Sequence, residues 1–331
     1  MASGKPERVA QVERVLVIFP GALGDLVCLG PALCALARRH HGATLELMAR
    51  EELARFAVDR IGFVRTGFSR IGITRGHSID RREVAALFAQ DAELISDLTG
   101  TAQFFRPFTR IYSFFASDDA RFRSALEAAA APGAVSFHAF RPAGAGHVAA
   151  GYLDEIGEHS APPAGHPDGH IEVLTGDVAE ARQAQARLGL SDACVALLFP
   201  GSGNRHKNWS ADNFVALASA LPPPMRALVV LGPAEDAIEP LLIACGIPWL
   251  RDQPLSTVAG LARIAAGFVG NDSGVSHLAA AAGAPGVAIF GPTNPDRWRP
   301  LGRVRVVRVD KLADLRFAEI ATALKEMIGV P

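Results

Sequence analysis

The sequence predicts an α/β protein made of two doubly wound, Rossmann-like domains that face a central cleft. Three observations support this fold class. Short apolar runs alternate with segments of helical period along the chain, which favours parallel β-α-β units. The length of 331 residues exceeds one compact core of usual size and indicates two domains. A glycine-bearing loop follows the first strand of each half, where open α/β sheets bind ligands.

The predicted boundaries divide the chain into five parts. Residues 1–11 are expected to form a flexible leader, and residues 12–157 the first domain. Residues 158–169 are rich in Pro, Gly and His and predict the linker to a second domain over 170–310. Residues 311–331 are expected to form a closing helix, of a kind that in this architecture often packs back on the first domain.

The amino-acid composition excludes several classes of protein. The chain is 49% apolar and 20% charged with a formal net charge of −1, which argues against a disordered or nucleic-acid-binding protein. No two of the four cysteines form a C-x-x-C pair, so a disulfide framework or zinc site is not expected and a cytoplasmic location is favoured. Without an apolar run of membrane-spanning length, any contact with the inner membrane face is expected to be peripheral.

The first domain begins with a predicted strand over 14–20, the turn Gly21–Asp25 and a helix over 26–39. The turn does not match G-x-G-x-x-G, and the candidate ribose-binding acid, Glu46, lies inside the next strand, so an NAD-dependent oxidoreductase is disfavoured. Asp25 opens the helix, where capping is the usual role of an Asp. Further strands are predicted over 44–48, 93–98, 111–115 and 135–140, and helices over 81–89, 120–130 and 147–156.

The second domain carries two glycine-bearing loops at predicted strand ends. A strand over 195–199 runs into a loop with Ser202, Gly203 and Lys207 before a helix over 211–220. A lysine among small residues at this edge of a sheet suits a phosphate partner. The next strand, 227–231, leads to Glu235, which could bind a ribose or cap the following helix, and the pattern leaves both open.

The stretch 267–298 predicts a complete β-α-β unit. A strand over 267–270 is followed by the turn 271–274, a helix over 275–282 and a strand over 287–290. The free N–H groups and the positive end of the helix make the turn a candidate anion site, and Ser273 and Gly274 allow close approach. The turn alone fits a tightly packed crossover equally well. A helix over 256–265 precedes this unit, and a strand over 304–309 and a helix over 315–328 follow it.

Three motifs resemble those of glycosyltransferase family 9, which contains the heptosyltransferases of lipopolysaccharide core assembly. D-S-G-x-x-H-L-A-A-A-x-G-x-P and F-G-P-T-x-P, over 272–295, are similar to its C-terminal signature. G-x-L-G-D-x-x-x-x-x-P-A-L, over 21–33, resembles its N-terminal motif. The segment 200–209 resembles P-G-[ST]-x-x-x-x-K-x-W, with Ser210 where the family usually has Pro. The resemblance spans nearly the whole chain and implies the GT-B fold.

This resemblance implies an inverting glycosyltransferase that moves a sugar, most often a heptose from ADP-heptose, to a saccharide or lipid-linked acceptor. It implies that Asp25, in an acceptor-side first domain, is the catalytic base. Metal-independent activity is expected because the chain has no Asp-x-Asp and offers lysine, hydroxyl and helix-terminus partners to the diphosphate. The diphosphate of the donor is expected on Ser202 and Lys207. Asp272 would repel a diphosphate, so we expect it toward sugar hydroxyls or holding the turn. The other predicted donor-binding residues are Gly203, Glu235, Ser273, Gly274 and His277; no cofactor and no metal ligand is expected.

Two alternatives share this fold. A nucleotide-sugar epimerase or hydrolase would use the same donor without an acceptor, and a non-catalytic binding protein would use only the donor. Asp25 argues against the second, because binding alone does not need a base in the first domain. The nucleobase, the sugar and the acceptor stay open, as does the question whether arginines of the first domain bind an anionic acceptor.

Overall fold

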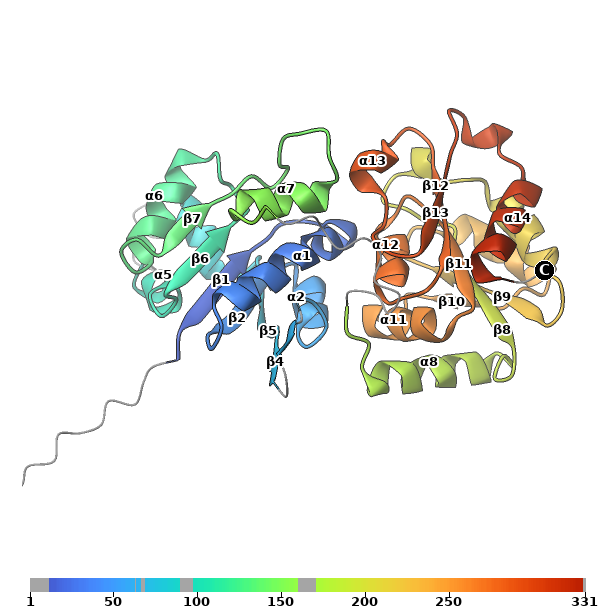
Figure 1. Cartoon of the computed structure of the whole chain (residues 1–331), viewed down its shortest axis with the longest axis horizontal. Coiled ribbons are helices and arrows are strands. Elements are labelled where there is room, and N and C mark those ends of the chain that lie inside the picture. Colours follow the sequence, from blue (N-terminus) through green and yellow to red (C-terminus); the bar gives the residue numbers. More distant parts are fainter. Residues whose placement is uncertain (1–11, 63, 67–68, 90–97, 160–170, 330–331) are drawn as a thin grey trace, which may run out of the picture.

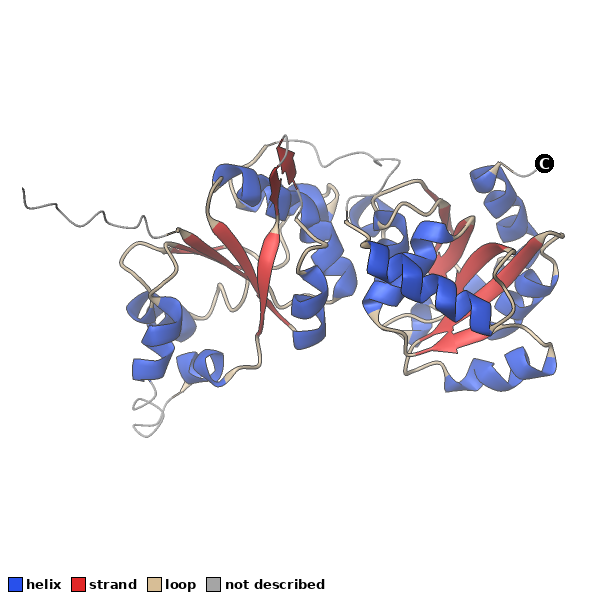
Figure 2. Ribbon diagram, turned by 90° about the horizontal axis from the view of Figure 1, so that it is seen from below, coloured by secondary structure: helices blue, strands red, loops and turns tan. Residues whose placement is uncertain are grey.

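The computed structural model of the chain describes residues 12–62, 64–66, 69–89, 98–159 and 171–329. The predicted leader, most of the predicted linker and most of the predicted strand over 93–98 lie outside these residues. Two α/β units lie side by side along the long axis, and each has helices on both faces of its own sheet (Figures 1 and 2). Among the described residues, no helix combines the length and apolarity needed to cross a membrane.

The first sheet is parallel throughout and has the order β5-β2-β1-β6-β7. Its strands are β1 (Arg14–Ile18), β2 (Thr44–Ala49), β5 (Ile73–Ser78), β6 (Arg110–Ser113) and β7 (Val135–Phe137); β3 (Val64–Thr66) and β4 (Ser69–Ile71) form a separate antiparallel pair. In the register of the sheet, Val15 lies opposite Leu45 and Arg110. The chain leaves β1 first to one side and later to the other, so the carboxyl end of β1 is a topological switch point.

Alternate residues of β1 bury themselves on opposite faces of the first sheet. Val15 and Val17 pack with α1 (Leu23–Arg39), α2 (Glu51–Ala57) and α7 (Val148–Glu155). Leu16 and Ile18 pack into a second core on the other face. That face is covered by α3 (Arg82–Ala85), η1 (Ala86–Phe88), α5 (Leu98–Phe105) and α6 (Ala120–Ala129). A strand that is buried on both faces needs apolar residues at successive positions, and this continuous apolar run is the pattern that predicted β1.

The second sheet is also parallel, with the order β10-β9-β8-β11-β12-β13. Its strands are β8 (Cys194–Phe199), β9 (Met225–Leu231), β10 (Trp249–Arg251), β11 (Gly267–Asn271), β12 (Gly286–Phe290) and β13 (Val304–Arg308). One face carries α8 (Thr175–Arg187), α11 (Leu255–Ile264) and α12 (Gly274–Ala281). The other carries α9 (Ala211–Ser219), α10 (Glu239–Ala244) and α14 (Phe317–Ile328). The carboxyl ends of β8 and β11 are adjacent, so their loops meet.

The position of the closing helix corrects one expectation. Ile320, Ala323 and Leu324 of α14 are buried in the core of the second domain, against α9 and strands β11 to β13. The helix therefore completes its own sheet instead of packing back on the first domain, and it lies at the end of the molecule farthest from that domain (Figure 1). The apolar side of α14 is buried within the second domain, so the helix does not need to pack on the first domain.

The two domains share one apolar core. A continuous cluster of buried residues runs from α1, α2 and α7 of the first domain into α8, α11 and α12 of the second. The contact between α1 and α12 lies at its centre. Ala279, Ala280, Ala281 and Ala282 are all buried there, and their small side chains let the helix approach its neighbours closely.

Candidate active site

Asp25 lies in the first turn of α1, which starts three residues earlier than the sequence predicts. The helix begins at Leu23, and the Asp25 carboxylate accepts a hydrogen bond from the backbone N–H of Ala22 at 3.0 Å. Asp25 is thus not the cap residue itself; it satisfies one free N–H at the helix start. Only glycine fits at position 21, before the cap residue Ala22, since a Cβ there would lie 2.3 Å from the Phe19 ring and 2.7 Å from the Asp25 Cβ.

An aromatic cluster supports the turn that carries Asp25. The Phe19 ring packs edge-on against Phe114, Phe140 and Tyr152, with centroid separations of 5.9, 5.6 and 5.7 Å. Tyr152 also donates a hydrogen bond to the carbonyl of Phe140 at 3.1 Å. Three strand ends and one helix of the first domain are therefore joined behind the turn, and the Phe19 ring packs directly against Gly21.

Burial raises the pKa of the Asp25 carboxyl above its ordinary value. The Ala22 N–H and the positive charges of Arg141, Arg50 and Lys207 oppose this effect without cancelling it. A carboxylate with a raised pKa is a stronger base than a solvated one. Lys207 belongs to the second domain, so its charge acts on Asp25 across the domain boundary.

Asn271 ties together the two loops of the second domain that carry the predicted donor site. Its side chain is fully buried at the carboxyl end of β11. The amide oxygen accepts from the Trp209 backbone N–H at 3.0 Å, and the amide nitrogen donates to the Pro200 carbonyl at 2.7 Å. Trp209 in turn donates from its indole to Leu315 O at 3.0 Å. The loop after β8 is therefore fixed at both ends.

Lys207 and Asp272 form an ion pair between these loops. The ammonium nitrogen lies 2.8 Å from Asp272 Oδ2, with side-chain exposures of 31% for the lysine and 8% for the aspartate. The Asp272 carboxylate therefore holds the Lys207 ammonium in place, and a contact of Asp272 with sugar hydroxyls stays a prediction. An ammonium has three donors, so two remain for a ligand after this bond.

Ser202 and Glu235, which are also predicted to bind the donor, form hydrogen bonds within the second domain. Ser202 Oγ is within donor reach of Asn204 O, at 2.7 Å, and of Asn208 Oδ1. The Glu235 carboxylate accepts from the Gly232 N–H at 2.7 Å, and a Cβ on Gly201 would clash with it. Glu235 therefore contacts both the loop after β8 and the loop after β9. Its contact with a ribose stays a prediction, as does the contact of Ser202 with the diphosphate. Gly203 is exposed on the same loop.

The start of α12 meets the start of α1 across the domain boundary. A Cβ on Gly274 would lie 3.0 Å from Leu23 Cβ and 3.1 Å from the backbone nitrogen of Gly24. Ser273, the residue before the helix, is buried and its hydroxyl lies 3.2 Å from that of Ser276. Two helix N-termini, each with free N–H groups and a positive dipole end, therefore face the same region.

The structure places His277 at this boundary. Its ring is buried, would lie 3.3 Å from a Cβ on Gly24, and its Nδ1 is 3.5 Å from Cys28 Sγ of α1. The residue thus contributes to the packing between α1 and α12. A contact between His277 and the donor stays a prediction.

Glu46 is not available to bind a ribose. It is 2% exposed and receives hydrogen bonds from Arg14 at 2.8 and 3.0 Å, and its carboxylate lies 2.6 Å from His77 Nε2. Burial alone would raise its pKa, but these partners outweigh burial and hold the pKa at about 2. The carboxylate therefore has a structural role on the α5 face of the first sheet.

Sequence reasoning missed Asn271 as a clamp and Arg50 and Arg141 as charges near Asp25. Both arginines follow strands: Arg50 comes directly after β2, and Arg141 comes shortly after β7. Their position after predicted strands is the signal that could have identified them. Arg60, one of the arginines considered for an acceptor, instead pairs with Asp177 of α8 at 2.7 Å. Within the described part of the chain, no three His, Cys, Asp or Glu side chains are grouped to hold a metal.

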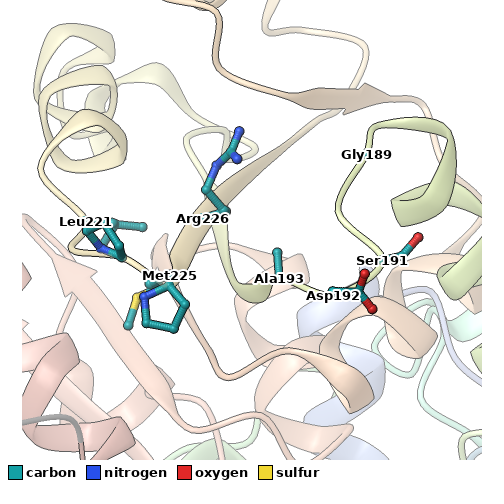
Figure 3. A pocket seen from close by; sticks show the side chains of 9 residues that line it. Gly189, Ser191, Asp192, Ala193, Leu221, Met225 and Arg226 are labelled. Atoms are coloured by element: carbon teal, nitrogen blue, oxygen red, sulfur yellow. The ribbon is translucent and has the colours of Figure 1, made fainter.

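A separate hollow of about 670 Å³ lies at the opposite edge of the second sheet (Figure 3). Its lining comes from two segments, one just before β8 (Gly189 and Ser191 to Ala193) and one around the start of β9 (Leu221 and Pro223 to Arg226). The amino ends of parallel strands are not where open α/β sheets bind their ligands. This hollow is therefore not part of the candidate site.

Comparisons with known proteins confirm the resemblance for the second half of the chain and show a shared fold for the whole of it. Residues 160–316 match the family described as glycosyltransferase family 9 (heptosyltransferase). A family 9 glycosyltransferase from Veillonella parvula DSM 2008 is similar in structure at a TM-score of 0.75 and 17% identity, covering 96% of this chain and 98% of that one. No relative among curated proteins matches the sequence.

Two solved structures from E. coli extend the structural similarity. ADP-heptose lipopolysaccharide heptosyltransferase II is similar at a TM-score of 0.70 and 16% identity, covering 95% and 98% of the two chains. Heptosyltransferase WaaC with ADP is similar at 0.66 and 17%, covering 95% and 99%. These similarities establish the GT-B fold, and with the family match they support a glycosyltransferase.

Proposed function

We propose that this chain, whose second half matches family 9 glycosyltransferases and whose fold is GT-B, transfers a heptose from an ADP-linked donor to a saccharide or lipid-linked acceptor with inversion. One observation carries the proposal. The N-termini of α1 and α12 meet at Gly24 and Gly274, with Asp25 on the first-domain side and the Lys207–Asp272 pair on the other. A base and an anion-binding corner thus face each other across one boundary.

Asp25 is suited to activate the acceptor. As the acceptor hydroxyl attacks the anomeric carbon, its proton passes to the carboxylate while the bond to the donor diphosphate breaks. Attack from the face opposite the leaving group inverts the anomeric configuration. Burial raises the pKa of Asp25 and so strengthens the base, while the positive charges of Arg141, Arg50 and Lys207 oppose that rise.

The departing diphosphate is stabilised by groups of the second domain. Lys207 has donors left after its bond to Asp272, and the first N–H groups of α12, at the positive end of the helix, suit an anion. These partners supply the charge that a divalent ion supplies in other transferases, and the sequence has no Asp-x-Asp. We therefore infer that turnover is independent of added metal.

ADP-heptose is proposed as donor from the solved relatives. The E. coli heptosyltransferase WaaC is known with ADP and with ADP-2-deoxy-2-fluoro heptose. The charge of the acceptor is inferred from the first domain, where the positive charges of Arg50 and Arg141 act on the proposed base. Guanidinium groups there suit a phosphorylated or acidic saccharide, and such an acceptor on a lipid would bring the enzyme to the inner membrane face.

The decisive experiment compares wild type with Asp25→Asn. Asn can still accept the Ala22 N–H, so folding and ADP binding should stay close to wild type, whereas sugar transfer should fall on the order of 10²–10⁴-fold. The assay measures sugar transfer to acceptor extracts, alongside a melting curve and an ADP titration. Full transfer activity in the variant would contradict the assignment of the base. Donor turnover without any acceptor would instead indicate the epimerase or hydrolase alternative.

A further inference from the structure

We propose that Arg297 is a positioning residue for the transfer reaction, which it serves by holding a first-domain loop against the second domain. The loop, residues 141–147, joins β7 to α7; Arg297 belongs to α13 (Pro295–Trp298), which follows β12. This inference rests on the proposed function, because the loop begins at Arg141, whose positive charge acts on the proposed base. In Figure 1, α13 lies directly across from the loop that precedes α7.

The guanidinium of Arg297 binds three backbone carbonyls of the loop. One terminal nitrogen donates to Gly144 O and Gly146 O, both at 2.9 Å, and the other donates to Pro142 O. A planar group with fixed donors suits three carbonyls gathered in one place better than a flexible ammonium would. These bonds cross between the domains, so they exist only when the domains are in this arrangement.

The sequence of the loop allows this convergence of carbonyls. Gly144 has a φ of +116°, a conformation that other residues rarely adopt. Pro142 is buried against α7 and excludes a side chain at Gly151, whose Cβ would lie 2.7 Å away. The loop is therefore braced from its own domain on one side and held by Arg297 on the other.

His147 adds a second bond between the domains. Its Nε2 lies 2.8 Å from Arg299 O, and its Nδ1 accepts the Ala149 N–H at the start of α7. Both bonds are satisfied by a neutral ring with its proton on Nε2. Burial lowers the pKa of His147, which favours that neutral form at physiological pH.

The held loop is connected to the base. Phe140, next to Arg141, packs on Phe19 and accepts the Tyr152 hydroxyl, within the aromatic cluster behind Asp25. The positive charge of Arg141 acts on Asp25 and opposes the effect of burial on its pKa. Arg297 therefore acts through the loop: it fixes where Arg141 stands relative to the base, and it does not touch the reacting atoms itself.

The charged and titratable groups that face Asp25 come from both domains. Arg50, Arg141 and Lys207 act on its charge, and Cys28 and Tyr152 are influenced by it. From α12 and the turn before it, the His277 ring packs against Gly24 and Asp272 also acts on Cys28. Of these, Arg141 lies in the loop that Arg297 holds. Releasing the loop should therefore weaken the effect of Arg141 and leave the others in place, so the pKa of Asp25 should rise.

The test compares Arg297→Met with the control Arg303→Ala, an exposed arginine of the same domain. Because a misplaced catalytic geometry lowers the rate of the chemical step, Arg297→Met should lower kcat roughly 10–100-fold. Affinity for ADP should stay within about twofold, since the donor loops are untouched. The acid limb of the kcat/KM profile should move to higher pH, a change that loss of stability alone would not produce.

Two further measurements separate this inference from the proposed function. Gly144→Ala strains the same loop from the first-domain side and should give the same kinetic changes. Small-angle scattering of Arg297→Met should show a larger radius of gyration, and this readout does not need a known substrate. Wild-type kcat, pH profile and scattering in Arg297→Met would overturn the inference. Absence of transfer by the wild-type protein, with scattering changed in the variant, would instead refute the proposed function alone.

Discussion

The Lys207–Asp272 pair allows a quantitative test of the donor site. Lys207→Ala removes the ammonium proposed to bind the diphosphate. A charge-assisted hydrogen bond of this kind contributes about 1.5–3 kcal/mol, which corresponds to roughly a 10–150-fold increase in the Kd for ADP. Isothermal titration with ADP measures the change directly. Lys311→Ala, which alters an exposed lysine of the same domain, should leave the Kd unchanged.

The same substitution should also lower stability. Asp272 is 8% exposed, so it cannot regain full hydration when its partner at 2.8 Å is removed. An unpaired buried acceptor costs about 1–3 kcal/mol, or roughly 2–12 °C in the melting temperature of a domain of this size. The double variant Lys207→Ala/Asp272→Asn should recover part of this loss, because it removes the unpaired charge.

Asp272→Asn alone separates two roles for the carboxylate. If Asp272 only aims the lysine, ADP should bind as well as before or more tightly, since a negative charge near the phosphates is gone. If it also contacts sugar hydroxyls, the ADP-sugar should bind more weakly while ADP does not. A wild-type Kd for ADP in Lys207→Ala, or equal loss of ADP affinity in both single variants, would refute the reasoning.

Three other predictions follow from the geometry. Gly274→Ala places a Cβ 3.1 Å from the Gly24 backbone, so it should lower turnover by roughly tenfold or more, whereas Gly176→Ala, with open space around it, should not; equal rates would contradict the tight boundary. The pKa of Glu46, held at about 2, adds stability that is complete above pH 4.5 and is lost as the pH falls toward 2, so acid unfolding of Glu46→Gln should depend less on pH in that range. EDTA should leave transfer unchanged, and activity restored by magnesium after EDTA treatment would count against the diphosphate site.

The apolar strands and the small-residue turns of both domains could be predicted from the sequence. Buried parallel strands such as β1, β8 and β12 read as short continuous apolar runs, and the loops after β1, β8 and β11 carry family motifs. By contrast, α2 and α8 were missed. The helix α8 has a mostly polar exposed surface and few apolar positions, so its helical period is weak in the sequence.

The long-range contacts of the site could not be predicted. The pairing of Lys207 with Asp272 joins residues 65 positions apart, and Arg297 reaches carbonyls more than 150 positions away. Such contacts depend on the order of strands and on the placement of two domains, which local pattern does not encode. The start of α1 was misplaced for a related reason: Leu23 and Gly24 are helical because α12 packs on them.

The contact between Gly24 and Gly274 has a mechanical consequence. It is a close backbone contact, and two other sets of bonds also join the domains: those of Arg297 on α13 and the Arg60–Asp177 pair on α8. In Figure 1, α13 lies at the top of the second domain and α8 at its bottom. Because the apolar core is continuous across this contact, the domains cannot part there without exposing buried apolar surface to water. Asp25, one residue from Gly24, is therefore held in place by the packing of both domains and not by the turn of its own domain alone.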